Sequence, residues 1–557
     1  MTDDRPAAPL RVPAIAVASA SLLAALAWSY VFAESIPFYF EDVELVLLAV
    51  ERNVVELLRA LVDPTALDTR YGLFDRPAEL LVLKALHAAA GFEPAVFHAF
   101  KGLCMLAVAG LAFAWIWRAT GALVFPALAA LWLTVSHPIY QSTLWIVDFD
   151  VVAHVFILVA LMLWARQLAG VTATSRAVVL ETIAIVTLAY VGSKTKGSAL
   201  VLPATIVLSG AAFGVKRFAR AVLIALAIGL LALAPRLADP AAVGAAIRWA
   251  NVGGFAAQLP HAIAFGLPGL AVAAASLLGL AFVVWPAPQR NRRARAAAAI
   301  ALAWIVSASA LWPLLPSSET RYLVGFLVPA IFGVCLAGAC VTRAARPRGV
   351  RHALAGALFV VVTATIAHDT ALAIHFRGVW GSRFIAADRT MATVEESFER
   401  ALVLYRYRRW VFYSPGSERG NRYVLARERA LSDVLGKPSD GSLRVPPRFE
   451  ELLWVDFDDA PLGAEPVARI EGRADTLFDR WLPHLGLRPQ EIDLMTLEMR
   501  SGAAYPVTLG LYRRDLTRGR TLPAPSRPCV EGEGKATERY FGTCLHAEDV
   551  FGTPSSR

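Results

Sequence analysis

Charged side chains are sparse before about residue 385 of this 557-residue chain, so each one between apolar stretches is a candidate for chemistry. A carboxylate near a membrane surface can act as a general base on an acceptor hydroxyl. Lysine and arginine can hold a phosphate and stabilise it as a leaving group. Together these groups suit attack by an acceptor on a lipid-linked phosphosugar. The candidates come from segments distant in sequence: Glu41, Asp42, Asp75, Arg76, His98, Lys101, His137, Asp148, Asp150, Lys194, Lys196, Glu319, Arg321 and Tyr322.

Several of these candidates also have a structural explanation. Glu41 and Asp42 could be a solvated pair or a helix cap before Val43, and Arg76 could form a surface ion pair with Asp75 or Glu79. A lone histidine such as His137 is more often structural. Lys194 could sit in a polar turn, and Arg321 could extend from an apolar span toward the interface.

The composition predicts a membrane protein. The chain is 57% hydrophobic and 18% charged, with a mean hydropathy of +0.52, whereas a soluble domain is about one quarter charged. The net charge of +9 resides mostly in short loops between apolar stretches. No basic stripe with interleaved aromatics is present, which argues against nucleic acid as a partner.

Apolar stretches of about 20 residues predict an all-α polytopic bundle. Lysine and arginine alternate between successive loops, which predicts a cytoplasmic N-terminus and a non-cytoplasmic C-terminus. About eleven spans are expected, at residues 12–33, 95–117, 121–136, 144–165, 177–192, 197–214, 219–235, 262–285, 296–315, 322–342 and 353–374.

Two regions outside the spans complete the predicted organisation. The transmembrane domain covers residues 1–384 and includes a long first periplasmic loop, 34–93, in which 43–61 and 77–90 suit amphipathic helices on the membrane face. We expect residues 385–557 to form a periplasmic C-terminal α/β or α+β domain that starts with a charged helix over 390–407. In this domain Cys529 and Cys544 could form a disulfide or remain two free thiols.

The order of local motifs resembles a known superfamily. The motifs are FYFEDVELV after the first span, LFDRPAELL in the long loop, SHPIYQ and WIVDFD, YVGSKTKG, and ETRYLVGF. The set is similar to the GT-C superfamily of polyprenyl-phosphate-sugar-dependent membrane glycosyltransferases. It looks nearest to the bacterial relatives of the transmembrane tetratricopeptide-containing O-mannosyltransferases, although this chain has no such repeats.

The resemblance implies a role for each matching residue. Asp42 would be the catalytic base, with Glu41 positioning the acceptor or a cation. Arg76, Lys194, Lys196 and Arg321 would bind the donor phosphate. The substrate would contact His137, Asp148, Asp150, Glu319 and Tyr322. The chain departs from the pattern at Thr195, where relatives have a glutamate, and at the inserted Thr320.

The resemblance thus implies an enzyme that transfers a sugar from a polyprenyl-phosphate donor to a periplasmic protein, lipid or glycan. No cofactor is required by it, and a divalent cation, Mg or Mn, near Glu41 and Asp42 stays open. The Arg-rich, Lys-poor composition suggests the inner membrane of a bacterium. Two alternatives from other classes are a non-catalytic membrane scaffold or assembly factor and a lipid-linked glycan transporter or flippase.

Overall fold

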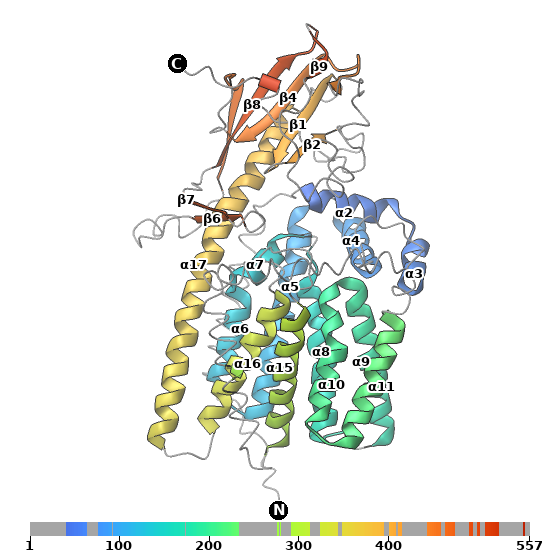
Figure 1. Cartoon of the computed structure of the whole chain (residues 1–557), viewed down its shortest axis with the longest axis vertical. Coiled ribbons are helices and arrows are strands. Elements are labelled where there is room, and N and C mark those ends of the chain that lie inside the picture. The colour runs from blue at the N-terminus through green and yellow to red at the C-terminus, as the bar shows by residue number, and fades with distance from the viewer. Residues whose placement is uncertain are drawn as a thin grey trace, which may run out of the picture. The chain divides into compact units, whose positions relative to one another are not determined.

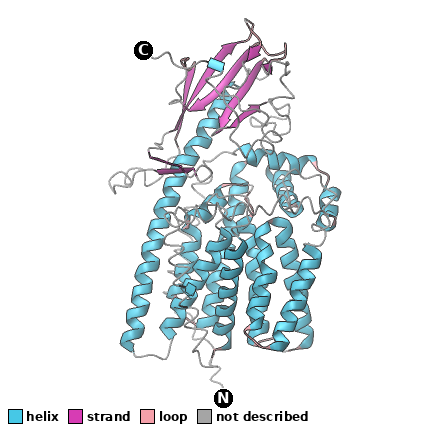
Figure 2. Cartoon of the chain, in the orientation of Figure 1, coloured by secondary structure: helices cyan, strands magenta, loops and turns pink. Residues whose placement is uncertain are grey.

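The computed structural model consists of helices followed by a set of strands, shown as cyan coils and magenta arrows in Figure 2. The chain divides into two compact units, of which the first holds most of residues 48–374 and the second most of 375–557. The structure describes residues 40–63, 76–91, 93–146, 148–172, 174–232, 276–277, 279, 291–311, 324–343, 348–394, 400–407, 410–414, 443–457, 463–473, 490–493, 498–501, 507–517, 519–522 and 550–551.

The first unit is built of apolar helices (Figure 1). Within the described ranges, six helical segments are long and apolar enough to cross a membrane: Pro94–Thr120, Asp150–Ala169, Ser175–Thr195, Arg292–Ala310, Val324–Thr342 and His352–Thr370. These segments confirm a mostly helical membrane protein, and the count of eleven spans stays a prediction. The expected spans 12–33 and most of 262–285 lie outside the described residues.

The bounds of the long helices follow local sequence signals. Helix α5 (Pro94–Thr120) has proline at its start, where the missing N–H costs nothing. It ends at Gly121, whose φ of 69° is the left-handed conformation that glycine adopts readily. Helix α8 (Asp150–Ala169) ends at Gly170 in the same way, and α9 is Ser175–Thr195.

The remaining helices of this unit are shorter or more tightly connected. They are α6 (Val124–Val135), α7 (His137–Leu144), the 3-10 turn η2 (Gly197–Val201), α10 (Leu202–Ala211), α11 (Val215–Ala232), α15 (Arg292–Leu311) and α16 (Val324–Arg343). Trp132, Trp164 and Trp304 are among the largest fully buried side chains, and they place the core between α6, α8 and α15.

The expected span 144–165 begins at the wrong residue. Helix α7 ends at Leu144 and α8 starts at Asp150, so the stretch between them leaves the helical conformation. The backbone N–H of Asp148 donates to the Trp145 carbonyl, and that of Asp150 donates to Asp148 Oδ1. This local turn competes with a continuous helix. Both aspartates therefore stand at the start of a helix instead of inside one.

The long loop contains three helices, α2 (Phe40–Glu51), α3 (Val54–Val62) and α4 (Pro77–Ala90). The last has the bounds that the sequence predicts. The stretch 43–61 is divided at Asn53, because Asn53 and Glu56 form a capping box that starts a new helix. Lys84 of α4 donates to the carbonyls of Ala49 and Val50, which ties α4 to the end of α2.

The second unit contains a five-stranded sheet in the order β2-β1-β4-β8-β5. Its strands are β1 (Ala401–Tyr407), β2 (Trp410–Ser414), β4 (Glu451–Phe457), β5 (Ala468–Gly472) and β8 (Val507–Asp515). Strands β1 and β4 pair in parallel and the other pairs are antiparallel. A short pair in this unit joins β3 (Leu443–Arg444) to β9 (Thr521–Leu522). Another pair joins β6 (Gln490–Asp493) to β7 (Glu498–Ser501), and its residues Ile492–Arg500 belong to the first unit.

One expectation for this region is wrong. A charged helix was predicted over 390–407, but α17 (Arg348–Val394) ends earlier and Ala401–Tyr407 is a strand. The run Ala-Leu-Val-Leu-Tyr-Arg-Tyr is rich in residues that favour strands, and its partner β4 buries Leu452 and Trp454. Strand propensity and packing in the sheet therefore decide the conformation of this segment.

Candidate functional site

A buried ion cluster lies where α8 begins and α9 ends. Lys196 Nζ lies 2.9 Å from Asp148 Oδ1 and 3.5 Å from Asp150 Oδ2. All three side chains are less than one tenth exposed. The two carboxylates are fixed by the start of α8, where a helix N-terminus favours negative charge. Lys196 stands in extended conformation immediately after Thr195, the last residue of α9.

The approach of α9 to α8 at this point depends on a small residue. A side chain at Gly192 would have its Cβ 3.1 Å from Ala199 and 3.4 Å from Phe156. The backbone N–H of Lys196 donates to the Gly192 carbonyl at 2.9 Å. Close packing of α8, α9 and η2 therefore holds the Lys196 ammonium at the aspartates.

Two further charged groups reach the cluster from α4 and α5. Glu79 is 1% exposed and interacts electrostatically with Arg76, Lys196, Lys101 and Asp148. Its Oε2 lies 3.4 Å from Nη1 of Arg76, the residue that precedes α4. Lys101 is 1% exposed and interacts electrostatically with Asp148, Lys196 and Glu79. The cluster thus joins α4, α5, α8 and the α9–η2 turn.

The Lys101 ammonium is the most unusual member. Its Nζ is buried and donates no hydrogen bond to any described residue. Its nearest ring is that of Phe149, with 5.1 Å from Nζ to the centroid. A buried cation without a hydrogen-bond acceptor is costly. It suits a site that receives an acceptor from a bound molecule.

Positive and negative groups are equal in number in this cluster. Arg76, Lys101 and Lys196 are three cations, and Glu79, Asp148 and Asp150 are three carboxylates. Burial raises the pKa of Glu79 above its usual value, against the opposing effect of Arg76. A protonated Glu79 would leave three cations against two carboxylates. The site can therefore accommodate an anion such as a phosphate.

Histidines flank the cluster without joining its ion pairs. His154 lies one turn along α8, with Nδ1 2.7 Å from the Asp150 carbonyl and its ring stacked on Trp304 at 6.0 Å. His98 is 3% exposed and precedes Lys101 by one turn of α5. Both rings are packed in the bundle at the level of the charged groups.

The structure brings together some of the residues that the sequence singled out. Asp148, Asp150 and Lys196 are in direct contact, and Arg76 contacts Glu79, as its structural explanation anticipated. Lys194 is buried two residues before Lys196, with Nζ 5.8 Å from the Tyr190 ring. Glu41 and Asp42 stand in the first turn of α2, and His137 starts α7. The side chains of these last three lie outside the described residues, as do Asp75, Glu319, Arg321, Tyr322, Cys529 and Cys544 entirely.

Sequence reasoning assigned no role to Glu79, and it named Lys101 as a candidate without giving it a specific role. Glu79 was considered only as a partner of Arg76, because nothing in a sequence shows that a carboxylate in an amphipathic helix is buried. Lys101 carried a clearer signal, since it stands inside an apolar 27-residue helix. An ionisable residue at membrane depth is a functional candidate by default.

Within the described residues, no group of three or more His, Cys, Asp or Glu side chains is arranged to hold a metal ion.

Helix α17 is attached to the bundle by a polar contact. Asp369 in α17, one of the polar residues near the last span, accepts a 2.8 Å hydrogen bond from Trp132 Nε1. Asp369 therefore fastens α17 to α6.

Comparison with known proteins gives matches among solved structures only. No family model and no curated protein sequence matches the chain. The chain is similar to ArnT from Cupriavidus metallidurans in the apo state, with 15% identity over 69% of each chain and a TM-score of 0.39. It is also similar to the same protein bound to undecaprenyl phosphate, with 14% identity over 89% of this chain and 97% of that one and a TM-score of 0.45. A third similarity, to the arabinofuranosyltransferase AftD from Mycobacteria, has 17% identity, covers 90% of this chain and 40% of that one, and has a TM-score of 0.43.

Proposed function

We propose that the chain is a GT-C-type membrane glycosyltransferase that takes its sugar from a polyprenyl-phosphate donor. The observation that carries this proposal is the buried ion cluster, and above all the Lys101 ammonium, which has no hydrogen-bond acceptor among the described residues. A phosphate that carries a sugar on one side and a long lipid on the other would supply that acceptor. Its lipid would lie along apolar helices, where a polyprenyl chain is soluble.

The reaction needs a base and a stabilised leaving group. The acceptor hydroxyl loses its proton to a carboxylate while its oxygen forms a bond to the anomeric carbon. The bond from that carbon to the phosphate oxygen breaks, and the polyprenyl phosphate leaves with its added negative charge. Lys101, Lys196 and Arg76 would stabilise this charge. Asp42 is our proposal for the base, on the resemblance of its Glu-Asp pair, with Glu41 beside it.

The remaining assignments are also proposals. We infer a bacterial inner membrane location with the cluster at the periplasmic face, and a periplasmic acceptor that is a protein, a lipid or a glycan. Lys194 and Arg321 would add contacts to the phosphate, and His137, Glu319 and Tyr322 contacts to the sugar or acceptor. Asp148 and Asp150 would orient Lys196 as well as the substrate, since both already contact its ammonium.

The first test is sugar transfer by the purified protein in lipid. Polyprenyl phosphates that carry mannose, glucose, galactose or arabinose are supplied with a cell-envelope extract as acceptor, and release of polyprenyl phosphate is measured. We expect release from one of these donors. We expect at least a tenfold loss for Lys101→Met, the effect of removing one charge-assisted contact worth about 1.5–3 kcal/mol. Lys84→Met is the matched control, since Lys84 donates only to the backbone of α2. If the wild type releases nothing from any donor, the scaffold alternative is favoured.

A second pair of variants tests the base. Asp42→Asn keeps the size of the side chain and removes its basicity, so transfer should fall by about 10²-fold or more. Glu93→Gln is the control, because Glu93 is an exposed carboxylate of the same loop whose side chain does not cap α5. Transfer by Asp42→Asn at the wild-type rate would remove Asp42 as base without touching the donor assignment.

A further inference from the structure

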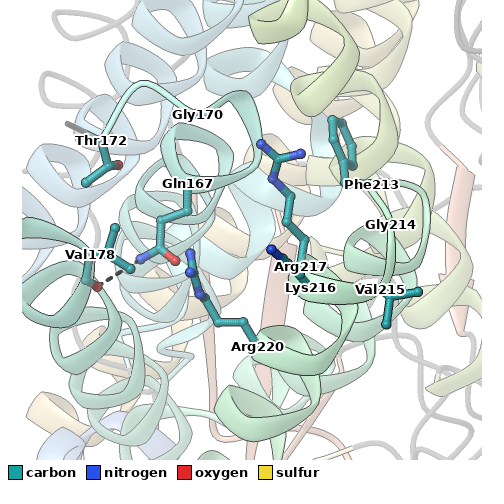
Figure 3. Close-up of a pocket in the computed structure, with 10 residues that line it drawn as sticks. All are labelled: Gln167, Gly170, Thr172, Val178, Phe213, Gly214, Val215, Lys216, Arg217 and Arg220. Carbon is teal, nitrogen blue, oxygen red and sulfur yellow. Dashed lines mark hydrogen bonds between the residues drawn. The ribbon is translucent and has the colours of Figure 1, made fainter. Parts of the chain in front are cut away.

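A cavity lies at the other end of the helices that build the ion cluster. It lies between the turn that joins α8 to α9 and the turn that joins α10 to α11 (Figure 3). The 20 residues of α8 separate it from Asp150 by about 30 Å at 1.5 Å per residue. Its volume of about 540 Å³ is in the range of small-molecule sites. It is lined by Gln167, Gly170, Thr172, Val178, Phe213, Gly214, Val215, Lys216, Arg217 and Arg220.

Its charges are all positive. Lys216, Arg217 and Arg220 come from the first two turns of α11, and no carboxylate is among the lining residues. None of these three cations forms an ion pair with a described residue. The carboxylate of Glu181 on α9 is already engaged, by Arg166 Nε at 3.0 Å and by the Thr172 hydroxyl at 2.8 Å. The three cations are therefore available to an anion.

The turn geometry places the Arg217 guanidinium next to Gly170, in the turn that forms one wall of the cavity. Gly170 has φ +70°, and a Cβ built there would lie 3.5 Å from Arg217 Nη2. Gly214, with φ +91°, makes the facing turn and lets α11 start at Val215. The first N–H groups of a helix have no acceptor within it, and they favour anions. The N-terminus of α11 thus adds to the positive character of its side chains.

The opposite wall offers a buried acceptor. Gln167 is 4% exposed, and its Nε2 donates to the Val178 carbonyl and to the Thr182 hydroxyl, both at 3.3 Å. Its Oε1 is buried and accepts no hydrogen bond from any described residue. An unsatisfied buried carbonyl costs about 1–3 kcal/mol. A ligand that carries a hydroxyl or amine donor besides its anionic group would satisfy it.

We propose that this cavity binds a phosphate group that also bears a hydrogen-bond donor, the chemistry of a phosphoglycerol head group. The phosphate would contact Arg217, Arg220 and Lys216, and the hydroxyl would donate to Gln167 Oε1. The ligand comes either from the head group of an anionic phospholipid or from a soluble organic phosphate. Basic pockets between membrane helices are suited to anionic lipid head groups. This site is independent of the sugar-transfer proposal, because it uses none of the residues of the ion cluster.

The test is a binding measurement on the full-length protein in neutral phosphatidylcholine nanodiscs. One arm adds phosphatidylglycerol to the nanodisc lipid, and the other adds glycerol 3-phosphate to the buffer. Binding is followed by native mass spectrometry and by titration at two salt concentrations. We expect Arg217→Gln and Arg220→Gln each to weaken binding about tenfold, which corresponds to about 1.4 kcal/mol. We also expect the wild-type affinity to fall as salt rises.

The control is Arg118→Gln, which removes an exposed cation at the end of α5 that does not line the cavity. Retention of phosphatidylglycerol that glycerol 3-phosphate does not displace would support a lipid site, whereas saturable glycerol 3-phosphate binding would support a soluble ligand. The proposal is overturned if neither probe binds, or if Arg118→Gln weakens binding as much as the cavity variants. Elution volume and thermal unfolding of each variant establish that it is folded.

Discussion

The two lysines of the ion cluster should respond in opposite ways to the same substitution. Lys196 compensates two buried aspartates, so Lys196→Met should destabilise the protein by roughly 3–5 kcal/mol. Lys101 donates to no described residue, so Lys101→Met should leave stability unchanged or raise it. Thermal unfolding of both variants in the same detergent measures the difference. Equal losses would mean that Lys101 is needed for folding and would weaken its assignment as a phosphate contact.

Glu79 makes stability depend on pH in a direction that follows from its burial. Burial raises its pKa above the usual 4.5, so between these two values the folded protein binds more protons than the unfolded chain. Its contribution is present at low pH and is lost as pH rises through the folded pKa. Glu79→Gln should therefore unfold at a higher temperature than the wild type at pH 8, and the gap should shrink at pH 5.

The control for this pH dependence is Glu181→Gln. Glu181 forms its ion pair with the exposed Arg166 at the other end of α8, outside the cluster. Its substitution should change stability by less than about 1 kcal/mol. A wild-type midpoint that rises between pH 5 and pH 8 while that of Glu79→Gln stays flat would contradict the assigned direction.

Among the helices, the packing of α16 on α6 depends on one glycine. A Cβ at Gly338 would lie 2.4 Å from the buried ring of Phe125. Gly338→Ala should therefore destabilise the bundle by about 1–3 kcal/mol through overpacking. The double variant with Phe125→Leu should recover part of this loss, because the smaller side chain leaves room for the methyl group.

Gly110 in α5 is the matched control for this clash. A Cβ at that position meets nothing within 4 Å. Gly110→Ala should be neutral or stabilising by up to about 1 kcal/mol, the difference in helix propensity. Thermal unfolding measures the stability of each variant. A Gly338→Ala variant as stable as Gly110→Ala would show that α16 does not pack on Phe125 of α6 as described.

Local sequence signals predicted some elements with their ends and failed where side-chain bonding decided. Helix-like apolar spacing predicted α4 with the bounds that the structure has, and proline at its start and Gly91 at its end are consistent with those bounds. The break at Asn53 depends on a capping box, and the break before Asp150 depends on a turn that Asp148 closes; apolar periodicity shows neither. Strand β1 lies in a segment where a charged helix was expected, and it pairs with β4 in the sheet instead.

The sequence predicted some residues of the candidate site but not which of its charged side chains are buried. Loop charges of the right types predicted that Asp148, Asp150 and Lys196 belong to one region, and the structure pairs them. Burial decided the rest, because Glu79 is distinguished from other charged helix residues only by what packs over it, whereas Lys101 already stands inside an apolar helix. A sequence shows which side chains can carry charge, whereas the packing of four elements determines which charges lack water.

At the scale of the whole molecule, the ion cluster and the basic cavity mark opposite ends of one set of helices. The lysine and arginine alternation predicts that the cavity end is cytoplasmic and the cluster end is outside. Such an arrangement would give the protein an anionic-lipid contact in one leaflet and a donor site at the other. Both proposed sites thus depend on orientation, which can be measured without any assay of activity.

Single cysteines at the two ends provide that measurement. Val62, at the end of α3, is 75% exposed, and Val215, the first residue of α11, is 84% exposed. In a background with all five cysteines, Cys104, Cys335, Cys340, Cys529 and Cys544, changed to alanine, a membrane-impermeant maleimide should label Val62→Cys in intact cells. It should label Val215→Cys only after the membrane is opened. The reverse pattern would place the ion cluster at the cytoplasmic face of the membrane. The proposed periplasmic donor site would then be wrong, and the donor would have to be bound from the cytoplasmic leaflet.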